Sequence, residues 1–201
     1  MAKIYTFNDK IITINNKWCE EYVEPTPPGP SFDEVTIGTQ TWMAKNLDID
    51  DGGDGIVHFD DVTANNVNFG TQYYYNFDAA VRVANTISGW HLPTKAEWET
   101  LISYCGGTDV AGGKLKSTTG WNDSHNGTDN YGFTAYPVGD VTATSTTSVS
   151  YKGRYTYFRT STASGSSATV AYISLAQAYD SIRTADLTLT KYYAVRLIKD
   201  T

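Results

Sequence analysis

The stretch GWHLPTKAEWETLISYCGG, residues 89–107, contains the clearest helix signal of the sequence. Thr94 follows a proline and stands three residues before Glu97. Its hydroxyl can accept from the Glu97 backbone N–H while the Glu97 carboxylate accepts from the Thr94 N–H, which is a capping box. The apolar residues that follow lie at helical spacing: Trp98, Leu101, Ile102 and Cys105. The stretch therefore predicts a capped helix with one buried face, closed by glycines.

His91 lies in the same stretch, between two apolar residues, Trp90 and Leu92. No second histidine stands at metal-binding spacing, and no nucleophile is nearby in sequence. We therefore expect Trp90 and Leu92 to pack this segment onto the helix and His91 to belong to the scaffold. A catalytic role for His91 is the alternative.

The rest of the body predicts one more helix and many strands. Within TQYYYNFDAAVRVANTI, residues 71–87, helical spacing relates Phe77, Val81 and Ala84. After Gly106 the chain consists mainly of Thr, Ser, Tyr, Val and Gly in short alternating runs, which suits antiparallel strands with long connections. The expected class is α+β.

The composition changes once along the chain. Residues 1–24 predict an arm of two or three short β-strands, which is too small to be stable alone and should pack on another surface. Residues 25–31 are rich in proline and predict a semi-rigid linker. We expect one globular domain at 32–201.

Bulk properties exclude several partners. The chain has 15 basic and 22 acidic residues and a net charge of -7, so no nucleic acid partner is expected. Its two cysteines, Cys19 and Cys105, are too few for a disulfide framework and are expected to be free thiols. No apolar run is long enough to span a membrane, and the first residues do not resemble a secretion signal.

Six motifs occur in an order that resembles the Fibrobacter succinogenes major paralogous domain. They are VTIGTQTWMAKNLD (35–48), GWHLPTKAEWETLISYCGG (89–107), AGGKLKSTTGW (111–121), DNYGFTAYPVGDV (129–141), FRTSTA (158–163) and YYAVRLIKD (192–200). The resemblance implies a C-type-lectin-like fold, in the variant shared with formylglycine-generating enzymes. That fold has two helices, a small mixed antiparallel sheet and a large loop-rich ligand face.

The enzymes of that fold use a late pair of cysteines for copper-dependent oxidation. This sequence has no cysteine after Cys105, so it has no thiolate for that chemistry. It also has no Gly-x-Ser-x-Gly elbow beside its three histidines, His58, His91 and His125. We therefore expect no catalytic residues and no enzymatic activity.

Two segments could bind calcium. WND at 121–123 echoes a lectin calcium motif, but one Asn-Asp pair supplies too few oxygens. DIDDGGDG at 48–55 places four carboxylates on a glycine-rich loop: Asp48, Asp50, Asp51 and Asp54. Its spacing does not fit an EF-hand, because Phe59 stands where the bidentate Glu belongs. We expect a solvated turn and no cofactor, with a structural calcium or sodium site as the alternative.

The late segment from Phe158 to Arg196 is the candidate binding surface. Tyrosine gives rigid amphipathic contact area, and Ser, Thr and Asp give adaptable hydrogen bonds, as in antibody paratopes. Ordinary wet strands with the same composition are the alternative. The candidate ligand-binding residues are Ser164, Ser166, Thr169, Tyr172, Ser174, Gln177, Tyr179, Asp180, Ser181, Arg183, Thr184, Asp186 and Tyr192.

These features favour a receptor-recognition module that binds a protein or glycan ligand on a target cell surface. The lectin-like fold is also that of proteins varied at their C-terminal ends by diversity-generating retroelements, and resemblance to them implies a varied late segment. The N-terminal arm would then attach the domain to a larger assembly, on a bacteriophage tail or a bacterial surface. The alternatives are a structural or assembly protein without a ligand and a glycan-binding surface lipoprotein.

Overall fold

The computed structural model describes residues 3–7, 10–14, 30–143, 145–174 and 180–201. The chain divides into two compact units, residues 1–31 and 32–201. In the first unit, strands β1 (Lys3–Phe7) and β2 (Lys10–Ile14) form an antiparallel pair. The arm's possible third strand and most of the linker at 25–31 lie outside the described residues.

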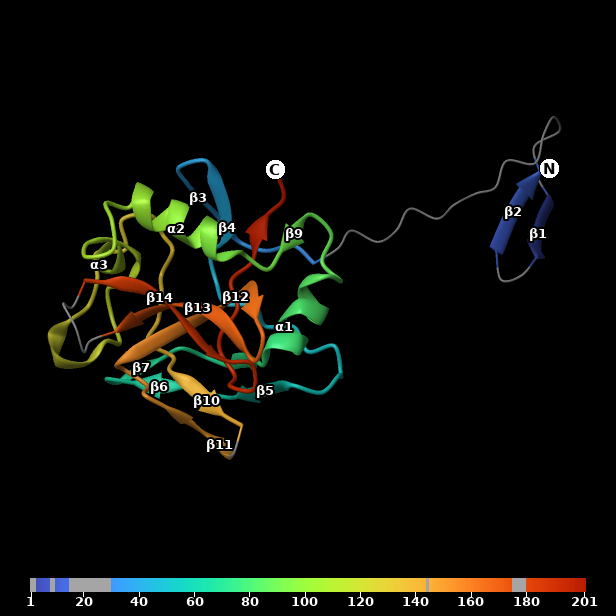
Figure 1. The fold of residues 1–201 in the computed structure, drawn as a ribbon. Coiled ribbons are helices and arrows are strands. Elements are labelled where there is room, and N and C mark those ends of the chain that lie inside the picture. Colours follow the sequence, from blue (N-terminus) through green and yellow to red (C-terminus); the bar gives the residue numbers. More distant parts are fainter. Residues whose placement is uncertain (1–2, 8–9, 15–29, 144, 175–179) are drawn as a thin grey trace. The chain divides into compact units, whose positions relative to one another are not determined.

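The described residues of the second unit form short strands, three α-helices and a 3-10 turn (Figure 1). The helical elements are α1 (Phe77–Ala84), α2 (Lys95–Tyr104), α3 (Ala111–Leu115) and η1 (Asn122–Ser124). The strands are β3 (Glu34–Ile37), β4 (Gln40–Met43), β5 (Ile56–Phe59), β6 (Thr63–Ala64), β7 (Val67–Asn68), β8 (Gln72–Tyr75), β9 (Trp90–His91), β10 (Asp140–Thr142), β11 (Ser145–Ser150), β12 (Tyr155–Ser164), β13 (Ser167–Ser174), β14 (Ile182–Thr188) and β15 (Ile198–Lys199).

Helix α2 begins as the sequence predicts. The Thr94 hydroxyl accepts from the Glu97 N–H at 3.2 Å, and the Thr94 N–H donates to the Glu97 carboxylate at 2.7 Å. The predicted capping box is therefore confirmed. The predicted stripe is buried as well, since Trp98, Leu101 and Cys105 are fully enclosed.

The prediction for residues 71–87 is only partly right. The helix α1 covers Phe77 to Ala84, but the preceding QYYY is strand β8, paired antiparallel with β5. The Asn76 side chain caps α1 by accepting from the Ala79 N–H, so the helix cannot begin earlier. Three consecutive tyrosines favour a strand over a helix, so the predicted helix is confined to the part of the run in which Phe77, Val81 and Ala84 show the helical spacing.

The two ends of the second unit meet in one sheet. Its strand order is β3-β4-β15-β9, and Ile198 on β15 pairs with Trp42 on one side and His91 on the other. Figure 1 shows the C-terminus beside β4 and β9. This sheet closes the domain, because strands from its beginning and its end share hydrogen bonds.

A second sheet consists of β12, β13 and β14, joined antiparallel in that order. Alternate residues face opposite sides of a sheet. One side carries Phe158, Ile173 and Ile182, which are buried in the main core against α2. The Phe158 ring stacks on Trp98 at 5.2 Å between centroids. The other side of this sheet carries the candidate surface described below.

The core of the second unit has two parts. The larger centres on the aromatic rings of Trp42, Trp98, Phe133 and Phe158, with centroid distances of 4.8 to 6.0 Å. The smaller lies around α1 and the segment before α2. It buries Trp90 and Leu92, which confirms that the stretch around His91 packs onto the body.

The α+β class is confirmed, but two details of the expected architecture were wrong. Three α-helices are present instead of two, because the glycine-rich AGGKL forms α3. Glycine is needed there: a Cβ at Gly112 would lie 2.5 Å from the Asp180 carbonyl oxygen. In place of one small mixed sheet, the described residues form several small sheets in which all strand pairs are antiparallel.

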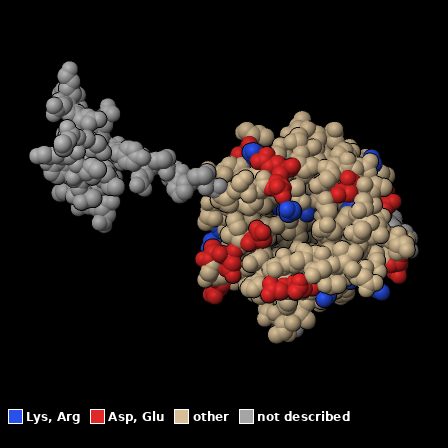
Figure 2. All heavy atoms as spheres, turned by 180° about the vertical axis from the view of Figure 1, so that it is seen from behind, with Lys and Arg blue, Asp and Glu red and all other residues tan. Residues whose placement is uncertain are grey.

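The charge of the molecule is uneven at its surface. Figure 2 shows one face, hollowed near its middle, with Asp and Glu side chains gathered around the hollow and fewer Lys and Arg. Within the described chain, no helix is long and apolar enough to cross a membrane.

Candidate functional site

The candidate residues of the late segment do not share one face. Tyr172 and Arg183 pair across β13 and β14, on the side of the sheet away from α2. Thr169 pairs with Asp186 on the opposite side. The alternation of neighbouring residues along a strand therefore divides the predicted set between two surfaces.

Two of the candidates are buried, which corrects the expectation that they form part of an exposed surface. Thr169 is 4% exposed, and its hydroxyl donates to Asp186 at 2.6 Å. Ser181 is 2% exposed, where the chain passes close to α3. The Thr169 side chain therefore joins β13 to β14, and both side chains are too deeply buried to reach a macromolecular ligand.

Other candidates are exposed but scattered. Ser164 and Ser166 stand at the turn between β12 and β13, whereas Asp180 stands before β14 with its carboxylate 3.9 Å from the buried Lys116 ammonium. Asp186 is exposed on β14, where Thr184 is half-buried. Gln177 and Tyr179 lie outside the described residues, as does the side chain of Ser174.

Two of the three remaining candidates, Arg183 and Tyr192, are partly occupied by contacts within the domain. Arg183 is half-buried and forms an ion pair with Asp109 at 3.2 Å. Tyr192 is half-buried against the main core, and its backbone exchanges hydrogen bonds with Val141. Of the predicted ligand-binding residues, Tyr172 is the best placed to bind a ligand, because it belongs to a continuous group of tyrosines.

That group, which we name the tyrosine row, consists of Tyr151, Tyr155, Tyr157 and Tyr172. Neighbouring rings lie 5.4 Å apart from Tyr151 to Tyr155, 5.6 Å from Tyr155 to Tyr157 and 5.7 Å from Tyr157 to Tyr172. Tyr151 is 55% exposed, and the other three are half-buried. The row therefore offers a rigid aromatic surface whose hydroxyl groups can also form hydrogen bonds.

Two buried residues support the tyrosine row from within. The ring of Tyr193 lies 5.1 Å from that of Tyr157, and the Arg159 guanidinium lies 4.5 Å from the Tyr193 ring. Burial lowers the pKa of Arg159 to about 10, so Arg159 remains charged at neutral pH. A fixed positive charge therefore stabilises the electron-rich face of the supporting ring.

Sequence reasoning missed three members of the row because the candidate segment was taken to begin at Phe158. The signal was present in YKGRYTYF, residues 151–158. Tyr155 and Tyr157 are two positions apart in a run with strand character, which places them on the same face. The cross-strand neighbour Tyr172 could not be known without the register.

The acidic loop at 48–55 is held by an arginine. Arg82 donates to both carboxylate oxygens of Asp51, at 2.7 and 3.0 Å, and to the Asp54 carbonyl oxygen at 2.9 Å. The hydrogen bond from Arg82 is the main reason that the pKa of Asp51 falls to about 2. Asp50 and Asp51 also accept from the N–H groups of Gly52 and Gly53, as in a solvated turn.

A structural calcium or sodium site at this loop was the alternative to a solvated turn. Across the described part of the chain, no group of three or more His, Cys, Asp or Glu side chains could hold an ion. The Asp51 carboxylate, which a cation would need, is already engaged by Arg82 on both oxygens.

His91 bridges two carboxylates. Its Nε2 lies 2.8 Å from Glu97 and its Nδ1 lies 2.6 Å from Asp200. Burial alone would lower the pKa of His91, but the hydrogen bonds and charges of Glu97 and Asp200 outweigh burial and raise it. The histidine thus ties the start of α2 to the C-terminus, and this contact accounts for both ring nitrogens.

We expect this bridge to make stability depend on pH. The folded-state pKa of His91 is raised above 6.5, and that of Glu97 is lowered below 4.5. The bridge therefore contributes its full stabilisation of the folded state between pH 4.5 and pH 6.5. This contribution is lost as the pH rises through the folded-state pKa of His91. Solvent screening limits it to less than about 1 kcal/mol. In thermal melts the fall in Tm above pH 6.5 should be smaller for His91→Gln; an unchanged slope would refute the bridge.

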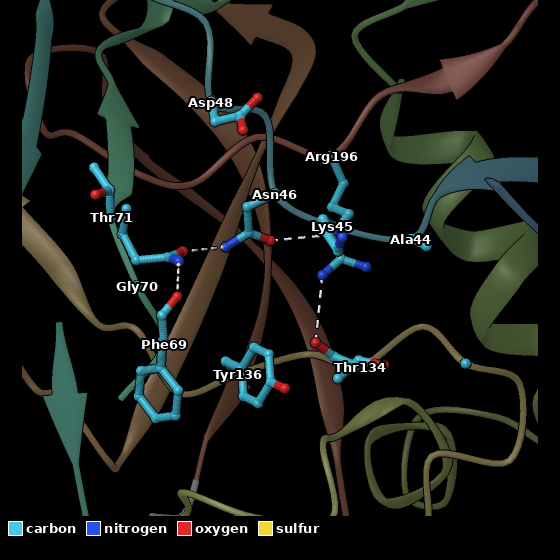
Figure 3. Close-up of a pocket in the computed structure, with 12 residues that line it drawn as sticks. Ala44, Lys45, Asn46, Asp48, Phe69, Gly70, Thr71, Thr134, Tyr136 and Arg196 are labelled. Carbon is cyan, nitrogen blue, oxygen red and sulfur yellow. Dashed lines mark hydrogen bonds between the residues drawn. The ribbon is translucent and has the colours of Figure 1, made fainter. Parts of the chain in front are cut away.

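A cavity of about 580 Å³ opens on the second unit (Figure 3). Its lining comes from four segments, namely residues 44–48, 69–72, 132–136 and Arg196. Figure 3 shows Asn46 and Arg196 across the cavity from Phe69 and Tyr136. Sequence reasoning did not select these residues, apart from Asp48, because they are far apart along the chain and no motif connects them.

Comparison with known proteins identifies the family of the chain. The model of the Fibrobacter succinogenes major domain matches residues 35–199, which include every element from β4 to β15. No curated protein and no solved structure matches the sequence. The match agrees with the order of motifs from VTIGTQTW to YYAVRLIK. The chain therefore belongs to the Fibrobacter succinogenes major domain family.

Proposed function

We propose that the chain is a recognition module that binds a protein ligand on a target surface through the tyrosine row. The single observation that supports the proposal is the continuous series of ring contacts in the tyrosine row, edge-on from Tyr151 to Tyr155 and stacked from Tyr155 through Tyr157 to Tyr172. Aromatic side chains are enriched where proteins bind one another, because they cover much area at little cost in conformational entropy.

Binding without chemistry is part of the proposal. His91 is held between two carboxylates and touches no nucleophile. Cys105 is buried, and burial raises the pKa of its thiol to about 11, which disfavours the reactive thiolate. The ligand is thus bound and not converted.

We further propose the C-type-lectin-like fold for the second unit. In support, strands from both ends of this unit pair in one sheet, and long irregular connections join its short strands. In this proposal the late segment is the ligand face and residues 1–31 attach the domain to a phage tail or a bacterial surface. Variation of the late segment by a retroelement goes with the proposal, and is tested by sequencing the DNA on either side of the gene.

The test is binding to an array that carries extracellular proteins and glycans. We expect capture of at least one protein and a loss of affinity of about tenfold or more in Tyr155→Ala and Tyr172→Ala, since central aromatic residues dominate interfaces. Tyr104→Ala is the matched control, because Tyr104 is 58% exposed on α2 and outside the row. All variants should keep the wild-type Tm within a few degrees.

Other outcomes would point elsewhere. Capture of glycans alone would favour a glycan-binding surface protein, and equal binding by all the variants would remove the tyrosine row from the site. Binding to nothing on the array would favour an assembly protein whose late strands pack against a neighbouring subunit.

A further inference from the structure

The cavity in Figure 3 is separate from the tyrosine row and shares no residue with it. Its volume of about 580 Å³ lies in the range typical of small-molecule sites. Loops and strand ends from distant parts of the sequence form it, so its shape depends on the folded domain.

One side of the cavity is aromatic. The rings of Phe69 and Tyr136 stack with centroids 4.8 Å apart and planes 27° from parallel. Gly120 packs directly against Phe69, since a Cβ at Gly120 would lie 2.6 Å from the Phe69 ring. The pair is therefore held in place and can present a flat apolar wall to a ligand.

The other side is polar and has a fixed orientation. Arg196 Nε donates to the Asn46 side-chain oxygen at 3.1 Å, and the Asn46 amide donates to the Gln72 side-chain oxygen at 3.1 Å. The Gln72 amide then donates to the Phe69 carbonyl oxygen at 2.7 Å. This chain of bonds fixes which end of each amide is the donor. Each amide nitrogen has a second hydrogen that a ligand oxygen can accept.

The charges around the cavity balance. Lys45 forms an ion pair with Asp33 at 2.7 Å, the buried Arg196 guanidinium donates to carbonyl oxygens and Asn46, and the Asp48 carboxylate is exposed at the lining. A phosphate or carboxylate ligand would meet Asp48 in a protein of net charge -7. A wholly apolar ligand would leave the second N–H group of each amide without a partner. A neutral ligand rich in hydroxyl groups satisfies both conditions.

From this geometry we propose that the cavity binds a neutral saccharide. The C–H face of a sugar ring covers the Phe69–Tyr136 wall, while its hydroxyl groups accept from the amides of Asn46 and Gln72 and donate to Asp48. The amides of Asn46 and Gln72 and the carboxylate of Asp48 then each have a hydrogen-bond partner on the ligand.

The test uses the full-length chain labelled with ¹⁵N and observed by NMR. The probes are the methyl glycosides of glucose, galactose, mannose and N-acetylglucosamine, each titrated to roughly 20 mM, which detects millimolar affinity. We expect at least one glycoside to shift the side-chain amide resonances of Asn46 and Gln72 saturably. Acetate and inorganic phosphate at the same concentration should leave these resonances unchanged.

Two matched variants locate the site. Asp48→Asn should weaken glycoside binding by about three- to tenfold, because it removes a charged acceptor for the sugar hydroxyls. Asp50→Asn should bind like the wild type, since Asp50 is an exposed acid of the same loop that does not line the cavity. Both side chains are exposed, so both variants should fold.

Three results would overturn the proposal. The first is the absence of saturable shifts with every glycoside, and the second is a response to acetate or phosphate in place of the glycosides. The third is an equal effect of Asp48→Asn and Asp50→Asn. None of these results bears on the tyrosine row, so failure here leaves the proposed protein-binding function to its own test.

Discussion

Replacing Arg196 by methionine is expected to lower the free energy of unfolding by about 3 to 5 kcal/mol, which is typical for breaking a buried charged network. Arg196 is 1% exposed. Its guanidinium donates to the carbonyl oxygens of Met43 and Thr134 at 3.3 Å, to that of Phe133 and to the Asn46 side chain at 3.1 Å. Methionine fills part of the volume but leaves all four oxygens without this donor.

Because Arg196 is a buried charge, its replacement by an apolar residue could in principle either lower stability or leave it unchanged. Burial lowers the pKa of Arg196 to about 9, so the folded chain carries an unfavourably desolvated cation at neutral pH. A buried charge can sometimes be replaced by an apolar residue at no cost, provided that its partners are replaced too. Here the partners are mostly backbone carbonyls, which no side-chain substitution removes. The contact of the guanidinium with the Phe133 ring, at 4.4 Å, is lost as well.

Urea unfolding at pH 7 measures the effect. Arg196→Lys should recover only part of the loss, because one ammonium group cannot replace a planar fork of donors. Lys199→Met is the control on the same terminal segment: Lys199 is exposed and forms an ion pair with Glu34 at 2.6 Å. It should cost less than about 1 kcal/mol. Wild-type stability in Arg196→Met would show that the carbonyls do not depend on this arginine.

Local sequence signals predicted the parts of the fold that are decided by near neighbours. The capping box at Thr94 and Glu97 involves residues three apart, so its geometry follows from helix formation itself. The buried stripe from Trp98 to Cys105 repeats at helical spacing for the same reason. The helical spacing of Phe77, Val81 and Ala84 likewise predicted α1, but it did not show that the preceding QYYY forms strand β8.

The candidate site depends on register, which the sequence does not contain. The rings of Tyr157 and Tyr172 are neighbours because the register of β12 and β13 places these two residues opposite each other. The same register turns Thr169 toward the buried side of the sheet. Composition could therefore identify a segment rich in tyrosine and serine, but not which of its residues face outward.

The cavity shows the same limitation more strongly. Asn46, Gln72 and Arg196 form one hydrogen-bonded chain, although the first and last are 150 positions apart. Arg196 stands among apolar residues in YYAVRLIKD, and arginine is rarely fully buried. Arg196 is buried because backbone carbonyl oxygens around Phe133 accept its hydrogen bonds. A pattern of side chains along the sequence does not show such backbone partners.

Trp98→Ala is the second change with a large expected effect, a loss of about 3 to 5 kcal/mol in the free energy of unfolding. Trp98 is fully buried, with its ring centroid 4.8 Å from that of Trp42, 5.2 Å from Phe158 and 5.9 Å from Phe133. It therefore joins helix α2 to the strands β4 and β12. Alanine would leave a cavity among three large rings, which cannot collapse without moving the helix.

Two variants separate packing in the core from helix propensity. Glu99→Ala changes the next residue of α2, an exposed acid 3.8 Å from the Lys95 ammonium, and should alter stability by less than about 0.5 kcal/mol. Trp98→Phe keeps an aromatic ring and should lose less than Trp98→Ala. Denaturant slopes equal to that of the wild type would show that all variants unfold from the same compact state. If Trp98→Ala cost no more than Glu99→Ala, α2 would not be packed on the three-stranded sheet, and the rigid support assumed for the tyrosine row would be lost.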